Sequence, residues 1–461
     1  MEHVTIADVV ACTNGALLAG NPETVLSGIC IDSRAVEPDC LFVPIVGEKV
    51  DAHRFLADVL NKGAAASLTS REDTEIPTDG KALIKVSDTL DALHAIGKLC
   101  RSRIPVSAVG VTGSVGKTTT REMIATALSA GKKVFRTSKN YNSRIGVPIT
   151  MSLMNPDDDI AVLELGMNVP GELGSISRLA KLAMAVVTNV GVAHIEFYGT
   201  QEKICEEKLT ITTGLEPGGI VFLNGDDPLL YAKKDSLDFP VVLYGLQEHN
   251  DYRAEDVQVR QKGTTFVMVH GETRIPVTLS VPGAHNVGNA LAALAVADHA
   301  GVDLVAAAKA LEQFGGFQNR LQMYQTGGYT IIDDTYNASP DSMKSGLTVL
   351  CDMECSGRRI AVLGDMFELG SRAPEFHYEV GVFAAKKPLT KLYTVGTNTK
   401  EIDRAVTDAK AAFPVEHFET VEEVIEVLKK ELLPGDILYL KASNGMKLKT
   451  ITAALVEANQ N

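Results

Sequence analysis

The sequence predicts an α/β protein with three domains, and three observations lead to this prediction. Its length of 461 residues exceeds what one hydrophobic core usually organises. In two separate stretches, apolar strand-like runs alternate with helix-length segments, as in parallel sheets covered by helices. The first ~100 residues mix short strands and helices without a phosphate-loop signature. We expect a small α/β N-terminal domain (1–100), a central parallel-sheet domain with a phosphate loop and a β insertion (101–315), and a C-terminal Rossmann-like domain (316–461).

The overall composition excludes several classes of protein. The formal net charge is −14 and the sequence pI is about 5.3, which opposes a general nucleic-acid-binding role without excluding one basic pocket. The N-terminus lacks a signal-peptide pattern, and no run approaches 18 apolar residues, so we expect no membrane span. Seven scattered cysteines without nearby histidines indicate reduced thiols rather than a zinc site. We expect a cytoplasmic protein.

The order of elements supports the two larger domains. From Val106 the chain reads as strand, glycine turn and helix, and the runs "DIAVLELG", "MAVVTNVG" and "GIVFLNGDD" continue the strands. Residues 250–282 alternate in short segments and predict an antiparallel β insertion, followed by a helix from near His285 to Gly301. The paired glycines of "FGGFQNRLQ" predict a hinge. Beyond it, "YTIIDDTY", "RRIAVLGDM", "KLYTVG" and "DILYLKAS" predict a second doubly wound unit.

The segment "GVTGSVGKTTT" is a candidate phosphate-binding loop that departs from the usual spacing. Val111 stands where G-x-x-x-x-G-K-[ST] has its first glycine. A buried strand nevertheless leads into a glycine-rich turn and a helix, whose free N–H groups attract phosphate oxygens. A turn that binds nothing is the alternative. The candidate phosphate-binding residues are Gly113, Ser114, Gly116, Lys117, Thr118 and Thr119.

Three further residues follow strands or helices near this loop. Glu164 closes a strand at the edge where ligands collect in parallel sheets, and its carboxylate suits Mg²⁺. A structural ion pair is the alternative for it. His194 follows another strand, although lone histidines are more often structural. Lys208 lies on a predicted helix and, taken alone, reads as a solvated surface residue.

Polar residues on the C-terminal side allow two interpretations each. Asn286 and Asn289 share a helix face and offer amides suited to an adenine edge, or they belong to an N-capped core helix. Arg320 suits a phosphate contact or is a solvated arginine. Asp334 and Asn337 follow a buried strand, which they terminate before a helix capped by Ser339 or Asp341.

These segments together resemble the Mur ligase family of ATP-dependent amide ligases. The loop resembles T-G-[TS]-x-G-K-[ST], which folylpolyglutamate synthases share, and H-x13-K joins His194 to Lys208. The family patterns H-N-x-x-N-x-x-A-A, N-R and D-D-x-Y-N-A-x-P follow in order. "IDSRAVEPDCLFVPIVGEKVDAHRF" resembles the segment that holds the uridine nucleotide, and "KNYNSRIGVP" matches N-x-N-N-x-x-G-V-P except at Ser143. The resemblance spans at least Asp32 to Gly370.

The resemblance implies roles for matching residues. It assigns ATP phosphate, ribose and adenine to the loop and to Asn286, Asn289, Arg320 and Asp334. It assigns catalysis to Lys117, Glu164, His194 and Lys208, and two Mg²⁺ sites to Thr118, Glu164, His194 and a carbamylated Lys208. It assigns substrate binding to Asp32, Ser33, Arg34, Asn140, Asn142 and Asn337.

The resemblance also implies a reaction and its substrates. "DDTYNASPDSM" and "VLGDMFELG" are most similar to the branch that adds D-alanyl-D-alanine to a UDP-N-acetylmuramoyl tripeptide, and the D-N-P-R motif of the third-residue ligase is absent. The implied enzyme is a monomer that uses ATP and an acyl-phosphate intermediate in peptidoglycan precursor synthesis. Lysine or diaminopimelate at peptide position three remains open. Another amide ligase of the superfamily, or a P-loop ATPase acting as a switch or motor, are the competing interpretations.

Overall fold

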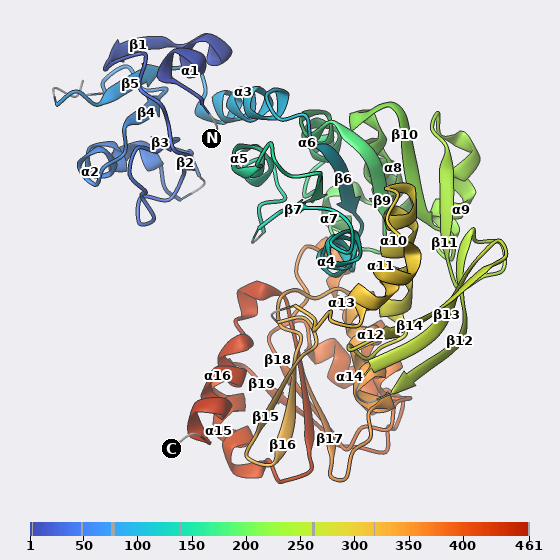
Figure 1. Ribbon diagram of the computed structural model, residues 1–461. Helices are drawn as coiled ribbons and strands as arrows, with labels where there is room; N and C mark the ends of the chain where they lie inside the picture. The colour runs from blue at the N-terminus through green and yellow to red at the C-terminus, as the bar shows by residue number, and fades with distance from the viewer. Residues whose placement is uncertain are drawn as a thin grey trace.

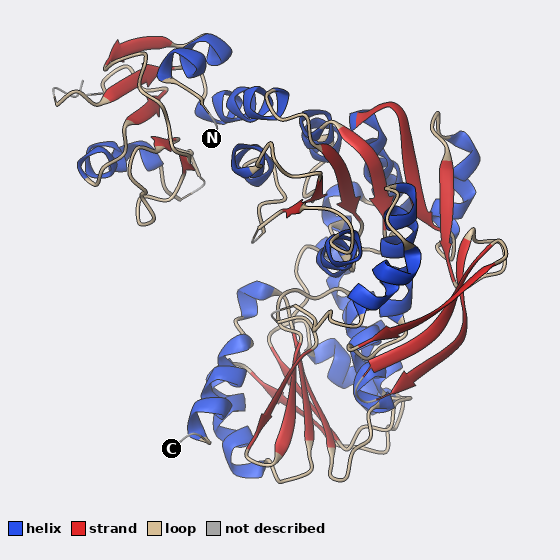
Figure 2. Cartoon of the chain, viewed as in Figure 1, coloured by secondary structure: helices blue, strands red, loops and turns tan. Residues whose placement is uncertain are grey.

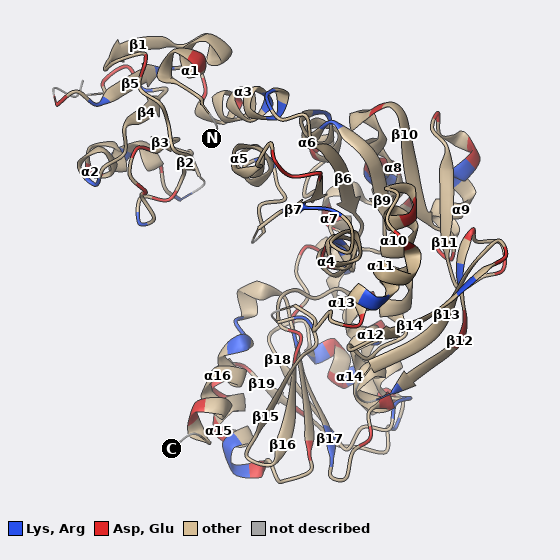
Figure 3. Ribbon diagram, in the orientation of Figure 1, with Lys and Arg blue, Asp and Glu red and all other residues tan. Residues whose placement is uncertain are grey.

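The computed structural model describes residues 1, 3–47, 49–74, 79–138, 140–260, 263–317 and 319–459. Three sheets, each with its own helices, follow one another along the chain (Figures 1 and 2). This arrangement confirms the predicted α/β class and its three units. Lys and Arg are interspersed with Asp and Glu over all three units (Figure 3). Within the described residues, we find no helix with both the length and the apolar character needed to cross a membrane.

The N-terminal sheet has the order β1-β5-β4-β3-β2, with β1 antiparallel to β5 and the other pairs parallel. Its elements are α1 (Ile6–Thr13), β1 (Ala16–Ala19), β2 (Ile29–Cys30), β3 (Leu41–Phe42), a 3-10 turn (Ala52–Phe55), α2 (Leu56–Asn61), β4 (Ala66–Thr69), β5 (Ala82–Lys85) and α3 (Thr89–Ser102). Helix α3 packs against α1 and also against α5 and α6 of the next unit. It therefore links the two bodies in Figure 1.

The central sheet has the order β14-β13-β12-β11-β10-β9-β6-β8-β7. Its strands are β6 (Ser107–Thr112), β7 (Val134–Arg136), β8 (Ile160–Glu164), β9 (Leu182–Val187), β10 (Leu215–Asn224), β11 (Val241–Gly245), β12 (Tyr252–Arg260), β13 (Gly263–His270) and β14 (Thr273–Leu279). Strand β13 pairs antiparallel with both β12 and β14, as predicted for the insertion. However, β12 also pairs parallel with β11, so the insertion extends the central sheet.

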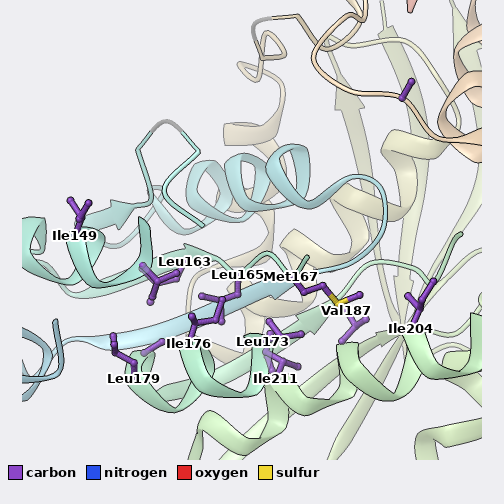
Figure 4. Packing of buried hydrophobic residues seen from close by; sticks show 14 of the residues in the cluster. Ile149, Leu163, Leu165, Met167, Leu173, Ile176, Leu179, Val187, Ile204 and Ile211 are labelled. Carbon is purple, nitrogen blue, oxygen red and sulfur yellow. The ribbon is translucent and has the colours of Figure 1, made fainter. Parts of the chain in front are cut away.

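Helices cover both faces of this central sheet. They are α4 (Lys117–Leu128), α5 (Gly146–Leu153), α6 (Glu172–Ala180), α7 (Ile195–Tyr198), α8 (Gln201–Leu209), α9 (Pro228–Lys233), α10 (His285–His299) and α11 (Leu304–Leu311), with 3-10 turns at Thr210–Gly214 and Lys234–Ser236. Because side chains alternate along a strand, Val109 of β6 packs in the core with α4 and α10, and Ala108 packs in the core with α5 and α6. Figure 4 shows the second core, where Leu163 and Leu165 meet Leu173, Ile176 and Ile211.

The C-terminal sheet has the order β15-β16-β20-β17-β18-β19, and only the β15–β16 pair is antiparallel. Its elements are β15 (Gln322–Thr326), β16 (Tyr329–Asp333), α12 (Pro340–Asp352), β17 (Arg359–Gly364), a 3-10 turn (Gly370–Arg372), α13 (Ala373–Ala384), β18 (Lys391–Val395), α14 (Lys400–Asp408), β19 (Val415–Phe418), α15 (Val421–Glu431), β20 (Ile437–Lys441), a 3-10 turn (Asn444–Met446) and α16 (Lys449–Ala458). Ser339 caps α12 through a capping box, which selects one of the two caps that the sequence offered.

Candidate active site

A cleft of about 1180 Å³ lies between the central and C-terminal sheets and collects most of the predicted site residues. The predicted residues in its wall are Ser114, Gly116, Lys117, Thr119, Asn142, Glu164, His194, Asn286, Asn289, Arg320, Asp334 and Asn337. Gly113, Thr118 and Lys208 do not line the cleft, although each contacts a residue that does. The carboxyl ends of β6, β8 and β16 all meet this cleft, which is where parallel sheets place ligands.

The phosphate loop joins β6 to α4 and holds its lysine away from any acidic partner. Gly113 and Gly116 have φ of 151° and 85°, and a Cβ at Gly113 would lie 1.8 Å from Thr188 Oγ1. Lys117 is the first residue of α4, and its Nζ donates to the carbonyl oxygens of Gly113 (2.7 Å) and Ser114 (3.3 Å). Burial lowers its pKa. Among the described residues, no carboxylate lies within ion-pair distance of Lys117, so the cation is available for an anionic ligand.

Glu164 ends β8 and is buried beside this loop. Its carboxylate accepts hydrogen bonds from Thr118 Oγ1 (2.8 Å) and Asn142 Nδ2 (2.7 Å). Arg121 Nη1 also lies 3.3 Å from Glu164 Oε2, so the structural ion pair weighed as an alternative is present together with the loop contact. Arg121 was not among the predicted site residues. Its position three residues after Thr118, on the same face of α4, was the available signal.

Lys208 is fully buried on α8, contrary to its reading as a solvated residue when taken alone. Its side chain is among the largest with less than 2% exposure, and Nζ contacts the Met167 sulfur at 3.8 Å. Met167 itself lines the cleft and is labelled in Figure 4. Burial, reinforced by the charge of Lys117, lowers the pKa of Lys208 well below its usual value. Among the described residues, no carboxylate pairs with Lys208.

His194 immediately precedes α7 and lines the cleft. Its φ is +65°, and its Nδ1 lies 2.6 Å from Oε2 of Glu368 in the C-terminal unit. The contact with His194 lowers the pKa of Glu368. Glu368 was not among the predicted site residues. It belongs to the "VLGDMFELG" motif, so the signal was present in the sequence but pointed to no individual residue.

The two asparagines of α10 lie on the phosphate-loop side of the cleft. Asn286 Nδ2 donates to the Pro282 carbonyl (2.9 Å), and Asn289 Nδ2 donates to Asn286 Oδ1 (3.3 Å). Thr120 of α4 donates to Asn289 Oδ1 at 3.0 Å. Helix α10 has no side-chain cap, so the alternative of an N-capped helix is not observed. The asparagines instead connect α10 to the loop helix.

The C-terminal wall contributes one arginine and one buried ion pair. Arg320 stacks over Tyr336 at 4.2 Å, and its Nε is buried without a hydrogen-bond partner among the described residues. Asp334 Oδ2 accepts from Lys441 Nζ (2.5 Å) and Tyr439 Oη (3.0 Å). Lys441 was not among the predicted site residues, although a lysine that ends the apolar strand "ILYLK" was a usable signal.

Four predicted substrate-binding residues lie outside this cleft wall. Asp32 accepts hydrogen bonds from the backbone and guanidinium of Arg34, and both side chains are exposed in the N-terminal unit. Arg34 holds the pKa of the Asp32 carboxyl below its usual range. The carbonyl of Ser33 accepts from Lys62 Nζ at 3.0 Å. Asn140 is exposed and does not line the cleft, whereas Asn142 does.

The donor set near the loop fits one magnesium ion without further change. Thr118 and Glu164 present oxygen ligands at hydrogen-bond distance from each other, and Mg²⁺ prefers oxygen ligands. His194 adds an imidazole, but Lys208 as a free amine presents no oxygen. Within the described residues, no cluster of three His, Cys, Asp or Glu side chains is arranged to hold a metal. As a free amine, Lys208 therefore adds no oxygen ligand for a second ion.

Comparisons with known proteins agree across the chain. Models of the Mur ligase family catalytic domain, the Mur ligase middle domain and the Mur ligase glutamate ligase domain match residues 25–100, 111–297 and 319–444. The UDP-N-acetylmuramoyl-tripeptide–D-alanyl-D-alanine ligase of Bacillus subtilis is 36% identical over 98% of both chains, and that of Escherichia coli is 31% identical over 99% of both.

Solved structures show the same relationship. A crystal structure of MurF from Acinetobacter baumannii superposes with a TM-score of 0.87 at 28% identity and covers 98% of both chains. MurF ligase from Thermotoga maritima in complex with ADP superposes with a TM-score of 0.82 at 27% identity, over 94% of this chain and 98% of that one. The full-length identity to two curated ligases and the three domain matches establish that this chain belongs to the Mur ligase family.

Proposed function

We propose that this protein is an ATP-dependent ligase that joins D-alanyl-D-alanine to a UDP-N-acetylmuramoyl tripeptide in peptidoglycan precursor synthesis. One observation carries the proposal: Lys117 of the central unit and Arg320 of the C-terminal unit line the same cleft. Among the described residues, Lys117 has no carboxylate partner and Arg320 Nε has no hydrogen-bond partner. Relatives that are named for this reaction align over the whole chain, and a solved relative contains ADP. ATP is therefore the nucleotide that we assign to the cleft.

The reaction has two chemical steps. The terminal carboxylate of the tripeptide attacks the γ-phosphate of ATP, which releases ADP and leaves an acyl phosphate. The amine of D-alanyl-D-alanine then attacks the acyl carbon, and inorganic phosphate departs as the amide forms. Lys117 offsets negative charge on the transferring phosphoryl group, and Arg320 supplies donors to the phosphates from the opposite wall. The remaining phosphate-loop residues, Gly113, Ser114, Gly116, Thr118 and Thr119, hold ATP through backbone N–H groups and hydroxyls.

We assign the remaining roles from the geometry and the family. Mg²⁺ neutralises phosphate charge when bound, and Thr118 and Glu164 would hold one ion. Asn286 and Asn289 face the adenine, and Asp334 contacts the ribose. Asn142 and Asn337 bind the peptide substrates inside the cleft. Asp32, Ser33, Arg34 and Asn140 bind the uridine nucleotide or sugar outside it.

We also propose that Lys208 is carbamylated and, with His194, holds a second Mg²⁺. Burial lowers the pKa of Lys208 and so favours the neutral amine, which is the form that reacts with carbon dioxide, and the product carries the missing oxygen ligands. We expect Lys208→Ala to lower kcat about 100-fold and short carboxylates such as acetate to restore part of it. Lys203→Ala, on the exposed side of the same helix, is the matched control. Full activity of Lys208→Ala would refute the carbamate role.

The remaining assignments concern the whole molecule. We propose domain boundaries at 1–100, 101–315 and 316–461, a monomer, and a cytoplasmic location, where both nucleotide substrates are made. The proposed substrates are small molecules, and the formal net charge of −14 does not favour nucleic-acid binding.

The test of the proposed function is ADP release with UDP-N-acetylmuramoyl tripeptide, measured with and without D-alanyl-D-alanine. We expect sustained ADP release only when the dipeptide is present, with both lysine and diaminopimelate tripeptides assayed in parallel. Turnover that is indifferent to the dipeptide would contradict the proposal and favour an ATPase. Turnover with a single amino acid instead of the dipeptide would favour another ligase of the family.

A further inference from the structure

The contact between Glu368 and His194 joins the two walls of the cleft. Glu368 lies in the loop that follows β17 of the C-terminal unit, and His194 follows β9 of the central unit. Their side chains approach to 2.6 Å through Oε2 and Nδ1. The backbone N–H of Glu196 also points toward the Glu368 carbonyl at 3.5 Å. The side chain of Glu368 is 46% exposed, so burial does not force it into this position.

Both partners of this contact have an unfavourable backbone conformation. His194 has a φ of +65° and Glu368 has a φ of +61°, a region of backbone conformation that residues other than glycine seldom adopt. Such conformations persist only where the surrounding structure imposes them, and they cluster at functional sites. Here they occur at the two ends of one contact between domains.

The C-terminal unit fixes the loop that carries Glu368. The carboxylate of Asp365 accepts the backbone N–H groups of Thr397, Asn398 and Thr399 at 2.9 to 3.0 Å. The N–H of Phe367 donates to Ser443 Oγ at 2.9 Å. The loop is therefore anchored at two of the three residues that immediately precede Glu368, which fixes the point from which this side chain projects.

We propose that Glu368 is a positioning residue that orients His194 and holds the C-terminal unit against the central unit. Its carboxylate lies at ion-pair distance from Nδ1, although the angles are not those of a hydrogen bond, and Nε2 is the ring nitrogen on the other side, left for ligands in the cleft. The proposal rests on the proposed function, because His194 matters to catalysis only if the cleft performs ligation. Glu368 therefore makes the geometry of His194 depend on domain closure.

The test compares Glu368→Ala and Glu368→Gln with the full-length parent. We expect kcat for dipeptide-dependent ADP release to fall 10- to 100-fold, with the KM for UDP-N-acetylmuramoyl tripeptide within twofold of the parent. Small-angle X-ray scattering of the proteins without substrates is the second readout, and we expect a larger radius of gyration in both variants. Adding Glu368→Ala to His194→Ala should lower kcat less than twofold further, because both changes remove the same contact.

Glu196→Gln is the matched control, since Glu196 is an exposed glutamate at the same interface that does not contact the His194 side chain. We expect its kcat and scattering to match the parent. An unchanged kcat and radius of gyration in both Glu368 variants would overturn the inference, as would fully additive effects of the Glu368 and His194 changes. If the parent itself shows no dipeptide-dependent turnover, the proposed function fails, and the scattering result alone then decides whether Glu368 holds the domains together.

Discussion

The two large domains differ in whether their lysines at or next to the cleft have a carboxylate partner. In the central domain, Lys117 and Lys208 have no carboxylate partner among the described residues, and burial lowers the pKa of both. In the C-terminal domain, burial also lowers the pKa of Lys441, but its Nζ lies 2.5 Å from Asp334 Oδ2. Burying a lysine without a partner costs stability whether it stays charged or gives up its proton, so this site is suited to an anionic ligand at Lys117 and to a modification at Lys208. Lys441 and Asp334 neutralise each other within the C-terminal domain, whereas the two central lysines leave room for a ligand or a modification.

The largest expected effect comes from removing the available cation of the phosphate loop. We expect Lys117→Ala to lower kcat for ADP release about 1000-fold, because the phosphoryl group then loses its nearest counter-charge. Lys133→Ala, beyond the end of the same helix and exposed, is the control and should retain parental activity. A loss of less than tenfold would show that Lys117 is not prepared for phosphate.

Breaking the Lys441–Asp334 ion pair of the C-terminal domain should lower the stability of the protein. Lys441→Met leaves Asp334 without its cation and should lower the free energy of unfolding by about 3 kcal/mol, measured by urea denaturation. Lys449→Met, at an exposed position, should change it little. Adding Asp334→Leu should recover most of the loss, since both charges are then absent. If Lys441→Met is as stable as the parent, the ion pair with Asp334 does not stabilise the C-terminal domain, and the contrast with the central lysines fails.

In the central domain, removing a buried lysine should raise the free energy of unfolding rather than lower it. In buffer depleted of carbon dioxide, Lys208→Met should raise the free energy of unfolding by about 2 kcal/mol at pH 7. The pKa of Lys208 is lowered on folding, so the unfolded chain binds more protons and stability rises with pH toward the ordinary lysine value. The advantage of the variant should therefore shrink between pH 7 and pH 10. A variant less stable than the parent at pH 7 would show that Lys208 has an unrecognised partner.

The smallest effect is expected at the exposed Asp32–Arg34 pair. Arg34→Ala should leave thermal unfolding unchanged, because exposed ion pairs contribute little to stability. If this turn binds the uridine nucleotide, the KM for UDP-N-acetylmuramoyl tripeptide should rise about tenfold. The KM for D-alanyl-D-alanine serves as the internal control and should not change. Equal changes in both values would indicate a general disturbance rather than a nucleotide contact.

The comparison also shows where sequence reasoning succeeds. The start of α4 at Lys117, the end of β8 at Glu164 and the start of α10 at His285 were each predicted within the segment where they occur. Such positions depend on short-range rules, since glycine turns, apolar strand runs and helix periodicity act over a few residues. The parallel pairing of β12 with β11 was not predicted, because strand pairing depends on residues far apart in the chain.

The sequence by itself determined the three α/β units, the phosphate loop and, through the resemblance, the family. The tertiary structure decided which side chains are free and which are already bound. It buried Lys208, gave Asp334 the partner Lys441, and brought Glu368 to His194, which lies far from it in the chain. Burial and ion pairing between distant segments depend on how whole domains pack, and no local pattern of residues encodes that packing.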